Sequence, residues 1–476
     1  MATLFRQSGG AVTVITPSTW TNPSNLFTTQ DRNDGSAYSF SALTSTVTLP
    51  SSNLADGYLI VAAFEYEDTS NGRHMPQARI QQHSGTGNFI YATTGGFNRD
   101  TSEDRAYVRT WAFVDNPSAS SEFRFYWQRD TDAPTGGTVR SVFEVIPFYY
   151  TDIGLYSSTS AAVYGGTTPN QVTGFTGTDG TNITISSNTV TVAGDNRRYL
   201  CLGSYYLEGV GANRSQRWGG FRLDGTKSDD AKAYTYYRNT SNDESGEMFT
   251  TLIETDTIDR TVDMFLYRGD GVGAGQGGAD NDGGSTPTVG DHAMVILELN
   301  TGVECFHSID NTGGVDLNVT TPVDHALCRT AAITFNDSAS FTRNDDNSMQ
   351  VEQTGDYLFG ANISAAQEVV STTSRWTSQA EFTVNGVEDT DTFGGDYGRN
   401  NQGTIDTFGW SANLMSYVAL TSGDDVGVST TELAGGEDGG QFEVQPNWSG
   451  FWGINLDTLE NVAPPPSTRN RCIIIS

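Results

Sequence analysis

Residues 347–367 read NSMQVEQTGDYLFGANISAAQ, and two other stretches repeat this pattern: STVTLPSSNLADGYLIVAAFEYED at 45–68 and NTVTVAGDNRRYLCLGSYYLEG at 188–209. In each stretch a run with strand-like alternation leads into a turn and then into a second run rich in aromatic residues. Tyr58, Tyr199 and Tyr357 fall in register, and a leucine follows each of them. Such self-similarity indicates one structural unit that occurs three times, and alternation places these three tyrosines on a buried face.

Two further landmarks follow each repeat in the same order. The first is a strand-like run that begins with arginine, at residues 73–81, 217–225 and 375–386. The second is an apolar run that closes the unit, at residues 141–149, 292–300 and 449–457. The second and third arginine runs end in Asp224-Gly225 and Asn385-Gly386, dipeptides that tight β-hairpins prefer. The first run lacks such a dipeptide, so the first unit departs from the pattern there.

The composition favours strands throughout the chain. Thr, Tyr, Phe and Val suit a half-buried pleated surface, whereas Gly, Asn and Asp suit turns. No segment shows helical periodicity over ~11 residues, and each unit holds about seven or eight strand-like runs. We therefore predict an all-β chain of three tandem antiparallel β-sandwich, jelly-roll-like domains. Their predicted limits are 1–150, 151–300 and 301–460, followed by a Pro-rich linker and C-terminal tail at 461–476.

One motif of the third unit resembles a known family. QVEQTGDYLFGANIS at 350–364, with its strand, G-x-Y turn and strand, resembles tumour-necrosis-factor-like and complement-head-like jelly rolls. FWGINL at 451–456 resembles their last strand. The resemblance covers only the landmark strands of this chain, and the second and first units match it less well. It implies trimers, or a pseudo-trimeric arrangement of the units.

The charge excludes some partners and changes along the chain. A formal net charge of −31 argues against binding to nucleic acid or to an anionic membrane surface. Residues 1–150 carry 14 acidic and 10 basic groups, net −4; residues 151–300 carry 19 and 10, net −9; residues 301–476 carry 24 and 6, net −18. We expect close protein contact through the first third and a more solvated last third.

The basic residues are almost all arginines, since Lys227 and Lys232 are the lysines of this chain. An arginine fork can bind a carboxylate through two parallel hydrogen bonds inside an interface, whereas lysine mainly solvates a surface. This composition favours ion pairs that lie within protein interfaces.

Motifs of catalysis are absent from the sequence. The five histidines show no HExxH spacing, and there is no GxSxG, GxxxxGK or GxGxxG motif in the required context. A glycosidase needs no fixed spacing of its two carboxylates, so this class stays open. We predict that the protein is not an enzyme and that it needs no cofactor.

Calcium is the one ion that the sequence suggests. The glycine-rich stretch at 268–291 contains Asp270, Asp280, Asp282 and Asp291, whose oxygens are suitable calcium ligands. Their spacing fits neither an EF-hand nor a glycine-rich nonapeptide repeat. A solvated insertion is the favoured interpretation, and Asp270, Asp280 and Asp282 are the weak calcium candidates.

The cysteine spacing and the hydropathy argue against a disulfide scaffold, structural zinc, a secretory signal and a membrane span. Cys201, Cys305, Cys328 and Cys472 show no CxxC spacing, so structural zinc and a disulfide scaffold are not expected, although Cys305 and Cys328 could pair. The N-terminal residues do not resemble a secretory signal, and no run of ~18 apolar residues is present.

Tryptophans near predicted loops are candidates for stacking on sugar rings. We consider Trp410 and Trp448 as possible glycan platforms, with core packing as the alternative. For Trp410 the two interpretations are equally favoured, whereas Trp452 is expected in the core.

The C-terminal tail differs from the rest of the chain. Three prolines form a stiff spacer, and Arg469 and Arg471 then precede Ile473, Ile474 and Ile475. A short β-branched apolar run at a free end needs a cover, which a β edge of a partner could supply. Docking onto the third unit of the same chain is the equal alternative. We take these five residues as candidate assembly residues.

A chain of tandem jelly-roll-like units with few lysines and without a signal peptide or catalytic motif resembles surface proteins of tailed bacteriophages. We therefore expect a structural virion protein on the particle surface, of the capsid decoration or head-fibre kind. Its expected partners are capsid or tail proteins and other copies of itself, with trimers in view. A receptor- or carbohydrate-binding tail fibre is the alternative, and an extracellular glycan hydrolase is less favoured. The absence of coiled-coil heptads and collagen-like repeats favours decoration over a fibre.

Overall fold

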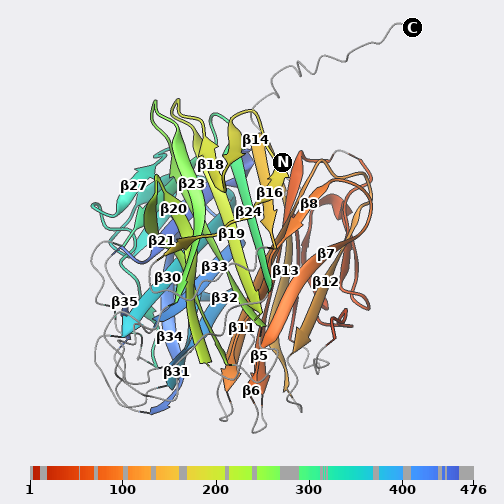
Figure 1. The fold of residues 1–476 in the computed structure, drawn as a ribbon, viewed down its shortest axis with the longest axis vertical. Helices are drawn as coiled ribbons and strands as arrows, with labels where there is room; N and C mark the ends of the chain where they lie inside the picture. Colours follow the sequence, from red (N-terminus) through yellow and green to blue (C-terminus); the bar gives the residue numbers. More distant parts are fainter. Residues whose placement is uncertain are drawn as a thin grey trace, which may run out of the picture.

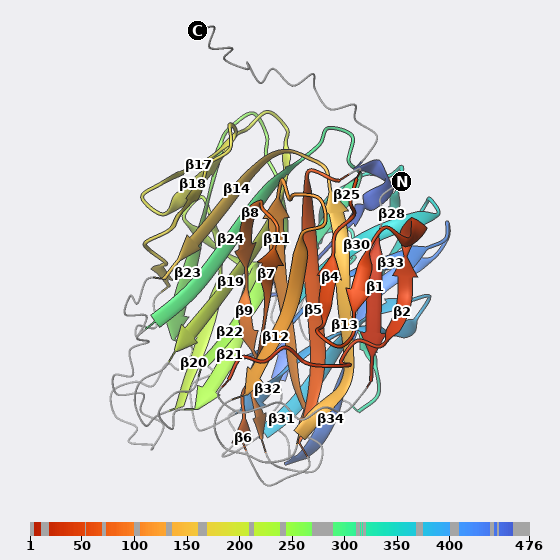
Figure 2. The ribbon, with the colours of Figure 1, turned by 90° about the vertical axis from the view of Figure 1, so that its right-hand side faces the viewer.

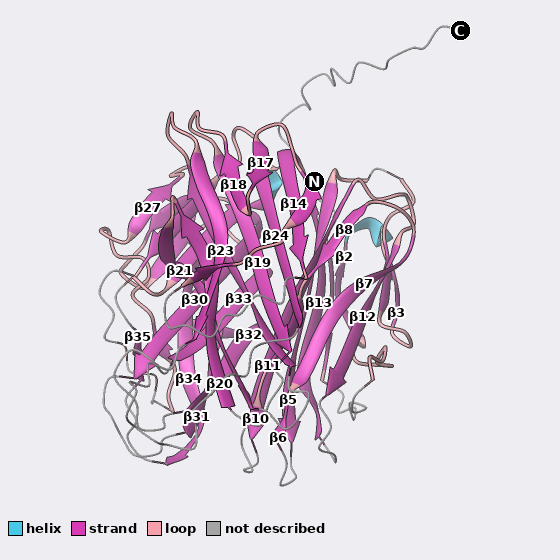
Figure 3. Cartoon of the chain, viewed as in Figure 1, coloured by secondary structure: helices cyan, strands magenta, loops and turns pink. Residues whose placement is uncertain are grey.

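The computed structural model describes residues 4–10, 19–52, 54–68, 73–99, 105–129, 136–159, 169–208, 214–238, 244–268, 289–310, 315, 317, 320–367, 375–399, 409–437, 442–444 and 447–459. These residues form antiparallel β-strands, with two short 3-10 turns and no α-helix among them (Figures 1 and 3). The chain is therefore all-β, as the composition predicted.

The strands divide into three sets along the chain, which we call units 1, 2 and 3. Unit 1 contains β1 (Phe5–Gly9), β2 (Thr29–Asn33), β3 (Ser39–Ser41), β4 (Thr46–Thr48), β5 (Gly57–Asp68), β6 (Arg73–His74), β7 (Pro76–Ser84), β8 (Asn88–Tyr91), β9 (Thr93–Gly95), β10 (Asn98–Arg99), β11 (Arg105–Asp115), β12 (Glu122–Arg129), β13 (Gly136–Phe148) and the turn η1 (Asp34–Ser36).

Unit 2 contains β14 (Tyr150–Ser158), β15 (Asn170–Gln171), β16 (Thr176–Thr178), β17 (Ile183–Ser186), β18 (Thr189–Val192), β19 (Arg198–Glu208), β20 (Arg214–Leu223), β21 (Thr226–Arg238), β22 (Glu244–Glu254), β23 (Arg260–Arg268) and β24 (Val289–Leu299).

Unit 3 contains β25 (Cys305–Ile309), β26 (Val323–Asp324), β27 (Ile333–Asn336), β28 (Phe341–Arg343), β29 (Ser348–Val351), β30 (Gly355–Gln367), β31 (Arg375–Val384), β32 (Val387–Arg399), β33 (Gly409–Leu420), β34 (Asp425–Glu437), β35 (Phe442–Val444), β36 (Gly450–Asn455) and the turn η2 (Leu456–Thr458).

Each unit has an inner and an outer sheet with the same strand order. The inner sheets run β2-β1-β13-β5-β11 in unit 1, β16-β14-β24-β19-β22 in unit 2 and β27-β25-β36-β30-β33 in unit 3. The outer sheets run β3-β4-β12-β7, β17-β18-β23-β20-β21 and β28-β29-β34-β31-β32. The three repeats of the sequence thus fall on equivalent strands, and each unit is an antiparallel β-sandwich with a jelly-roll-like order.

The hairpin turns follow the sequence closely. Asp224 and Gly225 both have positive φ, as do Asn385 and Gly386, which is the backbone of a two-residue type I′ turn. Unit 1 has no such turn, and the strand that would be equivalent to β21 and β32 is broken in two. There β8 pairs with β11, while β9 pairs with β7.

Each sandwich has its own apolar core. Tyr58, Tyr199 and Tyr357 are fully buried at the same place in the three cores, one residue after the start of β5, one after the start of β19 and two after the start of β30. The prediction that these tyrosines are buried in equivalent positions is confirmed, because the two-residue periodicity of a strand fixes which side chains face inward.

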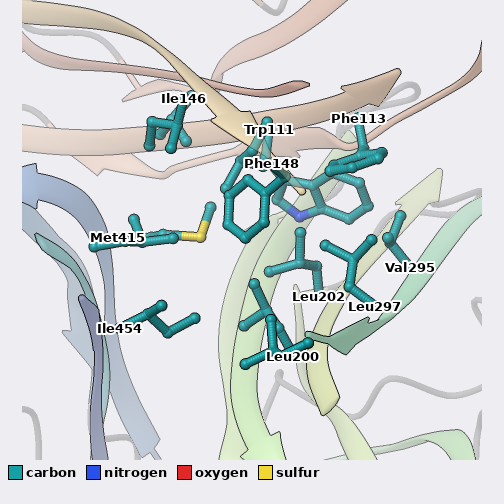
Figure 4. Packing of buried hydrophobic residues seen from close by; sticks show 14 of the residues in the cluster. Trp111, Phe113, Ile146, Phe148, Leu200, Leu202, Val295, Leu297, Met415 and Ile454 are labelled. Carbon is teal, nitrogen blue, oxygen red and sulfur yellow. The ribbon is translucent and has the colours of Figure 1, made fainter. Parts of the chain in front are cut away.

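A fourth apolar cluster, which we call the central core, joins the units. Leu59 pairs with Ile146 in unit 1, Leu200 with Leu297 in unit 2 and Leu358 with Ile454 in unit 3. All six side chains are fully buried and belong to this one cluster. Figure 4 shows side chains from all three units converging there. The inner sheets therefore turn their second faces toward one another.

The units contact one another in a cyclic order. In unit 1, β8, β9 and β11 lie against the inner sheet of unit 2; in unit 2, β21 and β22 lie against that of unit 3; in unit 3, β32 and β33 lie against β11 and β13 of unit 1. Such head-to-tail contacts form a closed ring when the rotation between units closes. A single chain therefore has the pseudo-trimeric arrangement that the resemblance implied.

Both ends of the described chain lie at one end of this body. Leu4 and Leu459 are fully buried in the central core, with Phe148, Leu299 and Leu456. The strands run roughly along the long axis, and the labels β6, β31 and β34 mark the opposite end (Figure 2).

Candidate functional site

The contacts between units 1 and 2 are mainly neutral. Gly95 of β9 pairs with Gly246 of β22, which joins the outer sheet of unit 1 and the inner sheet of unit 2 into one ten-stranded sheet. The Tyr206 hydroxyl donates to Gln77 Oε1 at 2.8 Å. Tyr149 alone separates β13 from β14, so these two units are also closely tethered.

The contacts between units 2 and 3 fasten the backbone of β22. The Asn362 side chain of unit 3 donates to the carbonyl of Thr250 at 2.6 Å and to that of Asp230 at 3.1 Å. The Trp452 indole donates from Nε1 to Thr250 Oγ1 at 3.1 Å. Asn362, Thr250 and Trp452 are buried, so these bonds orient the two units without exposed charge.

A buried histidine also joins units 2 and 3. His307 Nε2 lies 3.2 Å from Asp230 Oδ2 and 3.3 Å from Thr251 Oγ1, while its Nδ1 lies 2.8 Å from Thr334 Oγ1. Burial opposes ionisation of Asp230, but the hydrogen bond and charge of His307 outweigh it and lower the pKa of this carboxyl. The partners of the ring come from both units, with Asp230 and Thr251 on unit 2 and Thr334 on unit 3, so we interpret the group as a clamp between units.

The contact between units 1 and 3, which we call the ring-closing seam, combines ion pairs with an apolar cluster in which Tyr107 of unit 1 meets Phe393 of unit 3. Unit 1 supplies Arg6, Arg32, Arg109 and Arg140. Unit 3 supplies the carboxylates of Asp356, Glu381 and Asp391 together with backbone carbonyls. No short connection joins these two units, because unit 2 lies between them in the sequence.

Arg32 is a partly buried member of the seam. Its guanidinium binds both oxygens of Asp356, with Nη2 at 2.7 Å from Oδ2, and it donates to the Tyr417 hydroxyl at 2.8 Å. Its carbon Cζ lies 5.2 Å from the centre of the Tyr417 ring. Asp34 of unit 1 holds the same guanidinium at 2.8 Å, so the fork is fixed before the units meet.

Arg109 and Glu144 occupy the buried middle of the seam. Arg109 donates to the carbonyls of Met415 and Phe393, the latter at 2.7 Å, and burial lowers its pKa to about 10. Glu144 accepts hydrogen bonds from Ser416 Oγ at 2.7 Å and from the Tyr417 amide. Burial raises the pKa of Glu144, although Arg6 at 3.6 Å partly offsets this effect.

Arg140 lies between two buried carboxylates. It contacts Glu65 of its own unit and Glu381 of unit 3, and it donates to Gln379 Oε1 at 2.9 Å. Its Cζ lies 4.4 Å from the centre of the Phe393 ring. Burial raises the pKa of Glu381 to about 7, because desolvation exceeds the attraction of Arg140.

The uneven distribution of charge along the sequence is related to this seam, although the sequence did not show which residues would pair. The nearly balanced first third supplies the arginines, and the most acidic third supplies carboxylates. The expectation that arginine forks bind carboxylates inside an interface is confirmed at Arg32. The expectation that a partner contacts the protein through residues 1–150 stays a prediction. The acidic third unit contributes carboxylates to the seam, so this part of it is not solvated as expected.

Both candidate glycan platforms take part in packing. Trp410 is fully buried and donates from Nε1 to the Asp396 carbonyl at 2.9 Å, so the proposal that it stacks on a sugar is wrong. Trp448 is half-buried, and Lys232 Nζ lies 3.1 Å from the centre of its ring. Trp218 of unit 2 packs edge-on against it at 5.5 Å. The Trp448 ring thus bridges units 2 and 3, and Trp452 is in the core as expected.

The other candidate residues lie largely outside the described part of the chain. Asp270, Asp280 and Asp282 fall there, as do Arg469, Arg471, Ile473, Ile474 and Ile475. Among the described residues, no three His, Cys, Asp or Glu side chains are grouped so that they could hold a metal ion.

Cys201, Cys305 and Cys328 are buried free thiols, so Cys305 and Cys328 do not pair. Within the same described ranges, no helix has the length and apolarity that a membrane crossing requires.

Comparisons with known proteins give structural matches alone. No protein-family profile and no curated sequence matches this chain. Murine APRIL matches at 10% identity and a TM-score of 0.20, over 32% of this chain and 98% of its own. The globular domain of zebrafish complement 1qA protein matches at 13% identity and a TM-score of 0.20, over 32% of this chain and 96% of its own. Eiger TNF from S. frugiperda matches at 15% identity and a TM-score of 0.20, over 35% of this chain and 97% of its own.

Two of these matches belong, by name, to the groups that the third-unit motif resembles. TM-scores of this size establish no relationship, so the assignment of the fold depends on the strand orders given above.

Proposed function

We propose that this protein is a structural component of a virus particle, displayed on the particle surface, and that it acts through protein–protein contacts. Capsid decoration or a head fibre is the specific role that we favour. The observation that carries this proposal is the closed three-unit body, in which the inner sheets of all three units share one buried core. Such a preformed body can be attached to a particle and displayed as a single element.

The distribution of apolar surface supports a role as a preformed building block. The apolar faces of the inner sheets are already covered in the central core. Among the described residues, the strongly exposed large apolar side chains are Leu43, Ile258 and Val387, one in each unit. A body whose cohesive surfaces are used internally can be displayed in many copies without aggregation through those surfaces.

Several ionisable groups at the contacts between units support an assembly role. Arg32, Arg109, Glu144, Glu381 and His307 each have partners in a neighbouring unit. Their positions are explained by the contacts between units, so none of them requires a reaction to account for it.

Imaging of intact particles, with and without this protein, is the direct test. We expect a three-lobed density on the capsid exterior, with the end that holds Leu4 and Leu459 toward the shell. Deletion of residues 464–476 is expected to reduce incorporation, while the exchange Val387→Ser, at an exposed site of unit 3, leaves it unchanged.

Three results would count against the proposal. Density at the tail tip with loss of host adsorption would indicate a receptor-binding fibre instead. Turnover of a polysaccharide that a single carboxylate substitution abolishes would indicate a hydrolase. Particles that lack the protein altogether would remove the virion assignment.

A further inference from the structure

The ring-closing seam differs from the other two contacts in its covalent setting. Tyr149 links units 1 and 2, and residues 300–304 link units 2 and 3. Units 1 and 3 are held together by non-covalent contacts and by their shared neighbour. Of the three contacts in the ring, the seam is therefore the one whose two units are not joined by a short connection.

The two sides of the seam are complementary in charge. Unit 1 offers arginines at Arg6, Arg32 and Arg140, and unit 3 offers carboxylates at Asp391, Asp356 and Glu381. Each surface by itself carries an excess of one charge, which disfavours contact between two copies of the same surface. The favourable partner of either surface is the other one, in the same chain or in a second chain.

A connection between units 2 and 3 provides a place to bend. Gly302 has a φ of +92°, and a Cβ at this position would meet no atom within 4 Å. In the turn around it the Val303 amide donates to the Asn300 carbonyl at 3.1 Å, and Arg198 of unit 2 donates to the Val303 carbonyl at 3.4 Å. Rotation about the backbone here would swing unit 3 away from unit 1 once the contacts of Asn362, Trp452 and His307 with unit 2 are released.

We propose that the seam is an exchangeable interface whose second partner is another copy of this chain. In the exchanged form, unit 3 of one chain sits on unit 1 of another and makes the same ionic contacts. Heterologous contacts of this kind can close within one chain, between two chains or along a longer series. The inference does not depend on display on a virus particle and goes beyond that proposal.

The balance between the two forms depends on concentration. Within one chain, the short connections give the seam an effective concentration in the millimolar range, so the closed single chain dominates in dilute solution. Exchange is favoured where chains are crowded and where salt loosens the ion pairs first. When the salt concentration is lowered again, the ion pairs at the seam regain their strength and stabilise whichever form, closed or exchanged, has been reached.

Charge exchange at one ion pair provides a sharp test. The variant Arg32→Asp places an aspartate against Asp356 in its own seam, and the variant Asp356→Arg places an arginine against Arg32. Neither chain can restore its own pair. When the two are mixed, each seam formed between unlike chains has opposite charges again.

We expect the mixture, concentrated in high salt and returned to low salt, to give a species of twice the mass of one chain by native mass spectrometry. Neither variant alone should give it in comparable yield. The control is the double variant Arg32→Asp/Asp356→Arg in one chain, which restores its own pair and should remain a single chain in dilute solution. Circular dichroism checks that all three chains retain β structure.

A mixture that contains single chains alone, although both variants are folded, would overturn the proposal. If either variant fails to fold, the same salt cycle is applied to equal amounts of ¹⁴N- and ¹⁵N-labelled wild-type chains at high concentration. A two-chain species of mixed label supports exchange, and the absence of any two-chain species at every concentration refutes it.

Discussion

The indole of Trp452 donates a hydrogen bond to Thr250 Oγ1 at 3.1 Å, across the contact between units 3 and 2. In the sheet register Trp452 lies opposite Gly360, as Val295 lies opposite Leu202 and Glu144 opposite Val61. Trp452, Val295 and Glu144 are thus equivalent residues of the three units. Glu144 also reaches the preceding unit, at Ser416, and Val295 lies in the central core. At this one equivalent position, the three units therefore have an aromatic, an aliphatic and an acidic side chain.

Gly360 leaves the space that the Trp452 ring fills. A Cβ at Gly360 would lie 2.2 Å from Cζ2 of that ring. We expect Gly360→Leu to lower the free energy of unfolding by about 1–3 kcal/mol, or more if the backbone must shift. Adding Trp452→Val recreates the pair that Leu202 and Val295 form in unit 2, so the double variant should recover part of the loss. Urea unfolding measures both; a double variant less stable than Gly360→Leu would contradict this account.

Thr250 accepts the indole proton while Asn362 binds its backbone carbonyl. Replacing Thr250 by valine removes the acceptor and leaves the buried indole N–H without this partner. We expect a loss of about 1–3 kcal/mol in the free energy of unfolding. In a double-mutant cycle, Trp452→Phe and Thr250→Val should be less than additive, because they remove the same bond. Full additivity would show that the bond contributes nothing.

Leu200 packs in the central core, which contains residues of all three units. We expect Leu200→Ala to reduce the free energy of unfolding by about 2–5 kcal/mol. Hydrogen exchange should then speed up in β11, β22 and β33 together, because the units share this core. Val428→Ala, in the sandwich core of unit 3, serves as the control for a change confined to one unit. Separate unfolding steps for the three units would show that each folds alone.

Strand-level structure was largely predictable because it depends on local signals. The Asp224-Gly225 and Asn385-Gly386 turns, the buried tyrosines and the order of landmark strands all follow from alternation and from turn preferences. The broken strand of unit 1 coincides with the place where its sequence lacks a hairpin dipeptide.

The contacts between units were not predictable residue by residue. Alternation predicts that Trp452 or Glu144 points to one face of a sheet, but not that this face meets a second unit. Trp410 shows the same limit, since its burial depends on packing within unit 3 and on a carbonyl 14 residues earlier in the chain. The excess of carboxylates in the last third agrees with its contribution of Asp356, Glu381 and Asp391 to the seam, but it did not identify these residues.

Glu381 is expected to make the seam more stable at low pH than at high pH. Its pKa is about 7 in the folded chain because of burial, against an ordinary value of 4.5. A carboxyl with a raised pKa contributes stability that is fully present below pH 4.5 and is lost as the pH rises through 7. The loss between these limits is up to about 3 kcal/mol.

The test is the urea midpoint of the wild type and of Glu381→Gln between pH 4.5 and 8. The amide does not ionise, so the variant should lose this part of the pH dependence. Glu298→Gln, which removes the partner of Arg197 within unit 2, is the matched control outside the seam. Equal slopes for Glu381→Gln and the wild type would contradict the assignment.

His325 is expected to make the folded chain less stable at low pH, which is the opposite of the effect of Glu381. It is fully buried in unit 3, with Nε2 2.8 Å from Thr430 Oγ1, and burial lowers its pKa to about 4. A histidine whose pKa is lowered from 6.5 contributes stability that is present above pH 6.5 and is lost as the pH falls toward 4. This loss is also up to about 3 kcal/mol, so it partly cancels the gain from Glu381 between pH 6.5 and 4.5.

The two effects can be separated by combining variants. In Glu381→Gln the loss of stability on acidification should become steeper than in the wild type, because the opposing contribution is gone. Adding His325→Gln, whose amide can still bond to Thr430, should flatten it again. An NMR titration of the imidazole Cε1 proton follows His325 directly. A midpoint between pH 6 and 7 in the folded chain would show that this ring is accessible to solvent and would remove the predicted acid sensitivity.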